Sequence, residues 1–223
     1  MKIFFDIESI PDQSPGAMDR YIAQVKPPGN IKKPESIDKW MFENAEERAA
    51  EDYCKTGLSG LHGEICAIGF AFDGGDPVSL VRTHDTTEYA LIHEFANQLA
   101  DQRLQGEGGH QNIEWIGHNV LDFDLRFLKQ RCLVNRIPLG VRIPADARHG
   151  QNVFDTMKEW AGFRGFVKQD ELCEVFGLPT KSGMDGKDVW PAWQAGKFKE
   201  IREYNKHDVA TVTALYDIMT GGF

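Results

Sequence analysis

Asp6 and Glu8 are the first residues whose types and spacing suggest chemistry. They lie two residues apart at the end of a short apolar run, residues 2–6. Successive side chains of a strand point to opposite faces, so both carboxylates are expected on the same face. The apolar neighbours Ile3 and Ile7 indicate that the two acids stand at the edge of a core. A carboxylate there needs a partner, and a divalent cation is a suitable one. The alternative is that the two acids lie at a solvated strand end and bind no metal.

Tyr204 and Asp208 form a second polar pair. A helix is expected over residues 199–219, and positions four apart lie above one another on one helix face. Ile201 and Val212 extend this face, so the pair occupies a stripe expected to be apolar. A core tyrosine with a solvated hydroxyl, and an aspartate paired with a lysine, are the simpler alternatives.

The segment 117–124 is expected to run from a strand into a helix. A carboxylate at a helix N-terminus is stabilised by the helix dipole and free N–H groups. Asp122 or Asp124 could therefore be a plain helix cap, or Asp124 could join a site with the other acids. Asn119 is expected to hold the turn by bonding backbone groups.

The pattern of apolar runs predicts an α/β fold, with a mixed five-stranded sheet flanked by helices. The expected strands cover residues 2–6, 64–72, 77–82, 114–117 and 153–154. The Gly74–Asp76 break predicts an antiparallel hairpin between the second and third strands. Asp85 with Glu88 resembles a capping box that begins a helix. Further helices are expected within 121–135, 169–176 and 199–219, with loops at 145–150 and 181–187.

A long insertion is expected at about residues 11–62, between the first two strands of a single domain that spans 1–223. It is rich in proline at first and then predicts a helix over 38–54. Connections of this length usually have a function or move. Its aromatic side chains either anchor the insertion, which we favour, or stack on unpaired bases: Trp40, Phe42 and Tyr53.

Bulk composition is that of a globular protein, with 41% apolar and 26% charged residues among 223. The sequence offers no long apolar run or signal peptide, and its four cysteines are scattered. These features predict a cytoplasmic protein without disulfides or a membrane span. A net charge of −9 argues against extensive non-specific binding to nucleic acid, although a metal-dependent nuclease also concentrates carboxylates.

Taken together, three ordered motifs resemble those of DnaQ-like 3′→5′ exonucleases. They are Phe-Asp6-Ile-Glu8, Gly-His-Asn119 through Phe-Asp124, and Tyr204-x-x-x-Asp208. The tyrosine in the third motif is typical of the DEDDy subgroup, which includes the proofreading domains of family B DNA polymerases. The closest likeness is to free-standing relatives from bacteria and phages.

The resemblance implies a ribonuclease H-like fold and two divalent ions, Mg²⁺ or Mn²⁺. Asp6 would bridge the ions, Glu8 and Asp208 would hold the one that activates water, and Asp124 would support the other. Tyr204 would orient the water. His207 lies about 100° around the helix from Asp208 and is expected to be a bystander. The candidate substrate-binding residues are Asn119, Phe123, Arg126 and Lys168.

The resemblance predicts an exonuclease that removes nucleotides from the 3′ ends of single-stranded DNA in bacterial or phage DNA replication or repair. RNA is the nearest alternative substrate. Two further hypotheses are a catalytically silent accessory subunit that binds nucleic acid and a hydrolase of small phosphoesters. Any proofreading role would require a partner, such as a polymerase or another replication protein.

Overall fold

The computed structural model describes residues 1–105, 113–146, 148–180 and 183–221. The chain divides into two compact units, 1–8 with 65–223 and 9–64. Residues 147 and 181–182, which belong to the two predicted loops, lie outside the described residues.

The larger unit is built on a five-stranded sheet with the strand order β3-β2-β1-β4-β5. β1 pairs in parallel with β4, and β4 in parallel with β5, whereas β2 and β3 are antiparallel. The mixed sheet and its hairpin are therefore confirmed. The strand bounds are β1 Lys2–Ile10, β2 Glu64–Phe72, β3 Val78–Val81, β4 Glu114–Gly117 and β5 Val153–Asp155.

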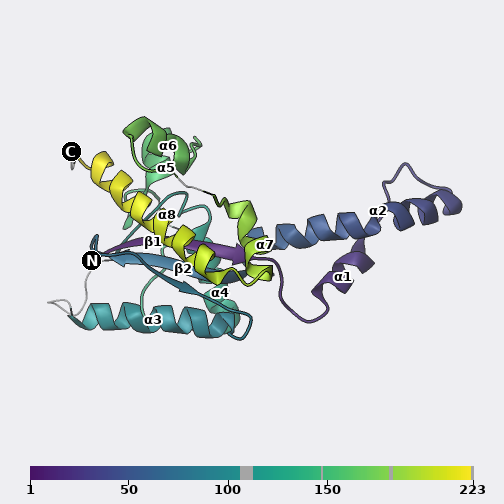
Figure 1. Ribbon diagram of the computed structural model, residues 1–223, viewed down its shortest axis with the longest axis horizontal. Helices are drawn as coiled ribbons and strands as arrows, with labels where there is room; N and C mark the ends of the chain where they lie inside the picture. The colour runs from purple at the N-terminus through teal and green to yellow at the C-terminus, as the bar shows by residue number, and fades with distance from the viewer. Residues whose placement is uncertain (106–112, 147, 181–182, 222–223) are drawn as a thin grey trace. The chain divides into compact units, whose positions relative to one another are not determined.

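Helices cover both faces of this sheet, with α3 and α4 on one face and α8 on the other (Figure 1). The helices of the larger unit are α3 Glu88–Gln105, α4 Asp124–Asn135, α5 Thr156–Ala161, α6 Gln169–Phe176, α7 Val189–Gln194 and α8 Phe198–Met219, with a 3₁₀ turn η2 at Gly186–Asp188. This is the α/β architecture of a ribonuclease H-like fold, as expected.

Alternation along β1 divides its side chains between two cores. Ile3, Phe5 and Ile7 belong to the core beneath α3 and α4. Phe4 packs on the opposite face against Val212 and other residues of α8. Because side chains alternate along a strand, the even-numbered positions that follow Phe4 are directed towards the α8 face.

The start of α3 differs from the predicted capping box. The hydroxyl oxygen of Thr87 accepts a hydrogen bond from the backbone N–H of Ala90, 3.1 Å away, which is N-capping geometry. Glu88 is only 4% exposed and accepts from the Ile65 N–H at 2.7 Å and from Arg131 Nη2 at 2.6 Å. Glu88 therefore ties α3 to β2 and α4, and it does not cap its own helix.

The smaller unit, residues 9–64, contains α1 (Ala17–Gln24), α2 (Pro34–Lys55) and the 3₁₀ turn η1 (Thr56–Leu58). The rings of Tyr21 and Tyr53 meet edge to face with centroids 6.0 Å apart. Tyr53 therefore helps to anchor this unit internally, whereas Phe42 is 93% exposed.

Among the described residues, no helix combines the length and the apolar character needed to cross a membrane.

Candidate active site

Three carboxylates gather where β1 faces α8. Asp6 and Glu8 follow Phe4 on the same face of β1, and they meet Asp208 of α8. One carboxylate oxygen from each residue lies within 4.8 Å of the others. Glu8 is 9% exposed and Asp208 3%, so their charges are poorly screened by water. Two segments about 200 residues apart in the sequence thus form one acidic cluster.

Burial along α8 explains how Asp208 reaches this cluster. Ile201, Val209 and Val212 are almost completely buried against the sheet. Asp208 precedes Val209 on this buried face of the helix and is directed inward. The predicted helix over 199–219 is confirmed as Phe198–Met219, and its apolar stripe delivers a carboxylate to the interior.

Asn205, which the sequence analysis did not single out, connects the cluster to the sheet. It is fully buried; its Nδ2 donates to Asp6 Oδ2 at 2.7 Å, and its Oδ1 accepts from the Ser79 hydroxyl at 2.6 Å. A Cβ added to Gly69 would lie 2.6 Å from Asn205 Oδ1. Glycine at this position of β2 therefore leaves room for the amide that orients Asp6.

Asp124 begins α4 and contacts the backbone of β1. Its Oδ1 accepts from the Ile7 backbone N–H at 3.0 Å. The pKa of Asp124 is raised from 3.8 to about 7, mainly by burial and partly by the negative charges of Asp155 and Asp208, while the hydrogen bond from Ile7 acts in the opposite direction. Asp124 is not one of the three acids within 4.8 Å, but the negative charge of Asp208 contributes to its raised pKa.

Asp155 holds the turn that delivers Asp124. Its carboxylate is fully buried and accepts from the backbone N–H groups of Asn119 at 3.0 Å and Leu121 at 3.1 Å. It also caps α5 by accepting from the Met157 N–H at 3.0 Å. Asn119 itself adopts a left-handed conformation, with φ of 59°. The aspartate of β5 therefore holds this turn, a role that the sequence analysis left unassigned.

Tyr204 lies between the acids and the η2 turn. Burial raises the pKa of its hydroxyl well above the ordinary value, and the negative charges of Glu8, Asp208 and Asp6 raise it further. A Cβ added to Gly186 would lie 4.0 Å from the hydroxyl oxygen. The phenol therefore stays protonated at physiological pH and can donate a hydrogen bond.

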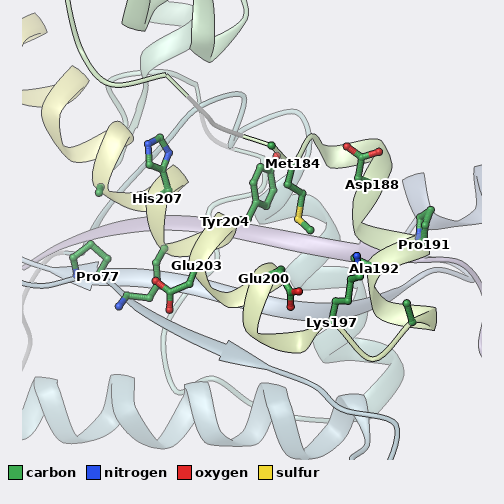
Figure 2. Close-up of a pocket in the computed structure, with 14 residues that line it drawn as sticks. Pro77, Met184, Asp188, Pro191, Ala192, Lys197, Glu200, Glu203, Tyr204 and His207 are labelled. Atoms are coloured by element: carbon green, nitrogen blue, oxygen red, sulfur yellow. The ribbon is translucent and has the colours of Figure 1, made fainter.

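A pocket of about 870 Å³ opens on the far side of Tyr204. Figure 2 shows Tyr204 beside Met184, with Pro191 and Ala192 contributed by α7. His207 also lines the pocket, and its Nδ1 lies 3.4 Å from the Thr211 hydroxyl. The three clustered acids are not among the lining residues, so Tyr204 connects two distinct environments.

The remaining substrate-binding candidates are dispersed around this centre. Phe123 packs on Phe127 with ring centroids 5.5 Å apart and belongs largely to the core. Arg126 is exposed on α4. Lys168 is exposed at the start of α6, next to Gln169, whose side chain donates to the Asp208 carbonyl at 3.3 Å. Lys168 thus adjoins a residue that contacts the backbone of Asp208, while Phe123 has a packing role.

The donor chemistry of the cluster fits a hard divalent cation. Its three convergent groups are all carboxylates, the ligands that Mg²⁺ and Mn²⁺ favour. The raised pKa of Asp124 shows that burial disfavours its charged carboxylate. A nearby bound cation would favour the charged form. Asp6, Glu8 and Asp208 are the residues that would hold such an ion.

The sheet and the acidic cluster define a ribonuclease H-like protein with a carboxylate site. Residues 62–220 match the model of a family described as "Predicted 3'-5' exonuclease related to the exonuclease domain of PolB". The chain belongs to this family. The matched range includes Asp124, Tyr204 and Asp208, while Asp6 and Glu8 precede it. A comparison with curated proteins finds no match.

Proposed function

We propose that this protein is a metal-dependent 3′→5′ exonuclease of the DEDDy type that acts on single-stranded DNA. The observation that carries the proposal is the convergence of Asp6, Glu8 and Asp208 within 4.8 Å, in a chain of an exonuclease family. Asp6, Glu8, Asp124 and Asp208 hold two divalent ions, Mg²⁺ or Mn²⁺. When bound, such ions stabilise the attacking and leaving oxygens of an in-line displacement at phosphorus.

The reaction removes the last nucleotide of the strand. A water oxygen forms a bond to the terminal phosphorus, and the bond from phosphorus to the 3′ oxygen of the preceding nucleotide breaks. The products are a nucleoside 5′-monophosphate and a strand shortened by one residue that ends in a 3′-hydroxyl.

Tyr204 contributes a hydrogen bond rather than a base. Its raised pKa keeps the hydroxyl protonated, so it orients the attacking water by donating to the water oxygen. Asn205 fixes the Asp6 carboxylate through the 2.7 Å hydrogen bond, and Asp155 fixes the turn before Asp124. The protein residues thus hold the acids ready before substrate arrives.

We place this activity in a single domain with an insertion at about 11–62. All five proposed catalytic residues belong to the unit formed by 1–8 and 65–223. The resemblance to free-standing relatives of polymerase proofreading domains favours a role in bacterial or phage DNA replication or repair, in the cytoplasm. A proofreading role would require a partner, such as a polymerase or another replication protein.

The test follows degradation of a 5′-labelled single-stranded oligonucleotide in Mn²⁺. Wild type is expected to give a ladder of products that shorten from the 3′ end, and chelation is expected to stop it. Asp208→Asn should slow the reaction at least about 100-fold. Asp217→Asn, on the exposed side of the same helix, is the matched control and should retain activity.

Two results would contradict the proposal. An inactive wild type would favour a binding role, and an active Asp208→Asn variant would remove the acidic cluster from the chemistry. Matched DNA and RNA strands test the substrate, because discrimination depends on contacts to the 2′-hydroxyl. A clear preference for RNA would overturn the assignment to DNA.

A further inference from the structure

A second pocket of about 810 Å³ lies beside the turn that leads to Asp124. Its walls come from residues within 121–126, 145–146, 148–149 and 158–164. Four cationic side chains and two carboxylates line it: Arg126, Arg148, Lys158 and Arg164, with Asp122 and Asp146. In a chain of net charge −9, a local excess of positive charge indicates a place for a polyanion.

Both carboxylates of the pocket are paired already. Asp122 lies 2.7 Å from Lys158 Nζ, and Asp146 lies 3.3 Å from Arg142, which is outside the pocket. His149 also has a partner, the carboxylate of Glu159. Within the ranges that the structure describes, no carboxylate pairs with the guanidinium groups of the three lining arginines, Arg126, Arg148 and Arg164. Their charge is available to a ligand.

A tight turn presents an aromatic ring next to one of these arginines, Arg164. Phe163 is 82% exposed, and the guanidinium carbon of Arg164 lies 6.0 Å from the centre of its ring. The backbone N–H of Gly165 donates to the Gly162 carbonyl at 3.1 Å, and a Cβ on Gly165 would collide with the backbone of Ala161. The turn therefore holds Phe163 outward, where an unpaired base can stack on it.

Helix geometry relates this pocket to the acids. Asp124 and Arg126 lie two positions apart on α4, so their side chains leave the helix about 200° apart. Asp124 is directed to β1, and Arg126 is directed away from it. The pocket and Asp124 thus lie on opposite sides of the first turn of α4, and the diameter of a helix with its side chains, about 10–12 Å, is a span that a few nucleotides of an extended strand can bridge.

We propose that this pocket binds the single-stranded nucleic acid a few nucleotides upstream of its 3′ end. Arg126, Arg148 and Arg164 contact backbone phosphates, and Phe163 stacks on an unpaired base. This inference rests on the proposed function for the placing of the 3′ end. The combination of cationic side chains with an exposed aromatic ring is typical of sites that bind single strands without regard to sequence.

The test measures binding without catalysis. Fluorescence anisotropy of a labelled 12-nucleotide single strand is recorded in EDTA over a series of salt concentrations. The pocket variant Arg148→Gln/Arg164→Gln is compared with Lys199→Gln/Arg202→Gln, which removes two exposed charges from α8. Each lost phosphate contact lowers the slope of log affinity against log salt by about 0.7 for a single strand.

The pocket variant is expected to lower that slope by about 1.4, and the α8 variant to leave it unchanged. Phe163→Ala is expected to weaken binding about 5- to 150-fold at constant salt. Circular dichroism melts check that each variant is folded. Equal slopes for the two double variants, or unchanged affinity in Phe163→Ala, would overturn the inference.

A second assay separates this inference from the proposed function. Hydrolysis of the p-nitrophenyl ester of thymidine 5′-monophosphate by wild type and Asp208→Asn, in Mn²⁺, reports on the acids alone, because the ester is too short to reach the pocket. If wild type hydrolyses the ester but the pocket variant keeps the wild-type slope of log affinity against log salt, only the pocket proposal is refuted. If the pocket variant lowers the slope but wild type does not hydrolyse the ester, the proposed catalysis is refuted and the pocket remains a binding site.

Discussion

Asp124 makes the metal-free protein sensitive to pH, and Asp124→Asn is expected to remove that sensitivity. The carboxyl group is 4% exposed, and its pKa is raised from 3.8 to about 7, mainly by burial. The folded protein therefore holds a proton between these two pH values that the unfolded chain releases. Stability from this group is present at low pH and is lost as pH rises towards 7.

The size of the effect follows from the pKa shift. Each pH unit between the two pKa values changes the free energy of unfolding by about 1.4 kcal/mol per proton. From pH 5 to pH 7, Asp124 should therefore lower the free energy of unfolding by up to about 3 kcal/mol. The asparagine variant keeps an oxygen for the Ile7 N–H and carries no charge at any pH.

Urea denaturation of both proteins in EDTA at pH 5, 6 and 7 measures this effect. The free energy of unfolding of Asp124→Asn, minus that of wild type, should grow by up to about 3 kcal/mol over this range. Asp217→Asn, an exposed substitution, should give a constant difference. A constant difference for Asp124→Asn as well would refute the argument from burial.

The remaining predictions concern residues around the site. Asn205→Ala leaves Asp6 and the buried Ser79 hydroxyl without an amide partner. Oligonucleotide hydrolysis should slow about 10- to 100-fold, and the free energy of unfolding in urea should fall by about 1–3 kcal/mol. Gly69→Ala should lower the rate because its Cβ would displace Asn205, so full activity would contradict the steric argument. Arg131→Met leaves Glu88 buried without its cation, so the free energy of unfolding should fall by about 3–5 kcal/mol. Adding Glu88→Gln to this variant should recover much of that loss.

Much of the sheet could be predicted from the sequence because its strands are marked by strong local patterns. The run 64–72 is almost uninterrupted in apolar residues, and the structure has a strand with those bounds. The helices α1, α5 and α7, of eight, six and six residues, were not predicted, although α6, which also has eight, was. Glu88 was assigned to a capping box because the sequence cannot show that Arg131 lies opposite.

The acidic residues of the site could be predicted from the sequence, whereas the residues that hold them in place could not. The spacing of Asp6 and Glu8 on a strand indicated a shared face, and the structure brings them to Asp208. Their catalytic roles remain predictions. Asn205 was missed, and Asp155 was given no role, because each acts through contacts with residues that are distant in the sequence. A buried asparagine in the apolar stripe of a helix was the available signal for Asn205.

The most direct test of the central claim is the number of Mn²⁺ ions that the purified protein binds, measured by electron paramagnetic resonance titration. Two ions per chain are expected for wild type, with binding greatly weakened in Asp6→Asn, because Asp6 is proposed to contact both ions. Absence of bound Mn²⁺ in wild type, or equal binding by Asp6→Asn, would contradict the account.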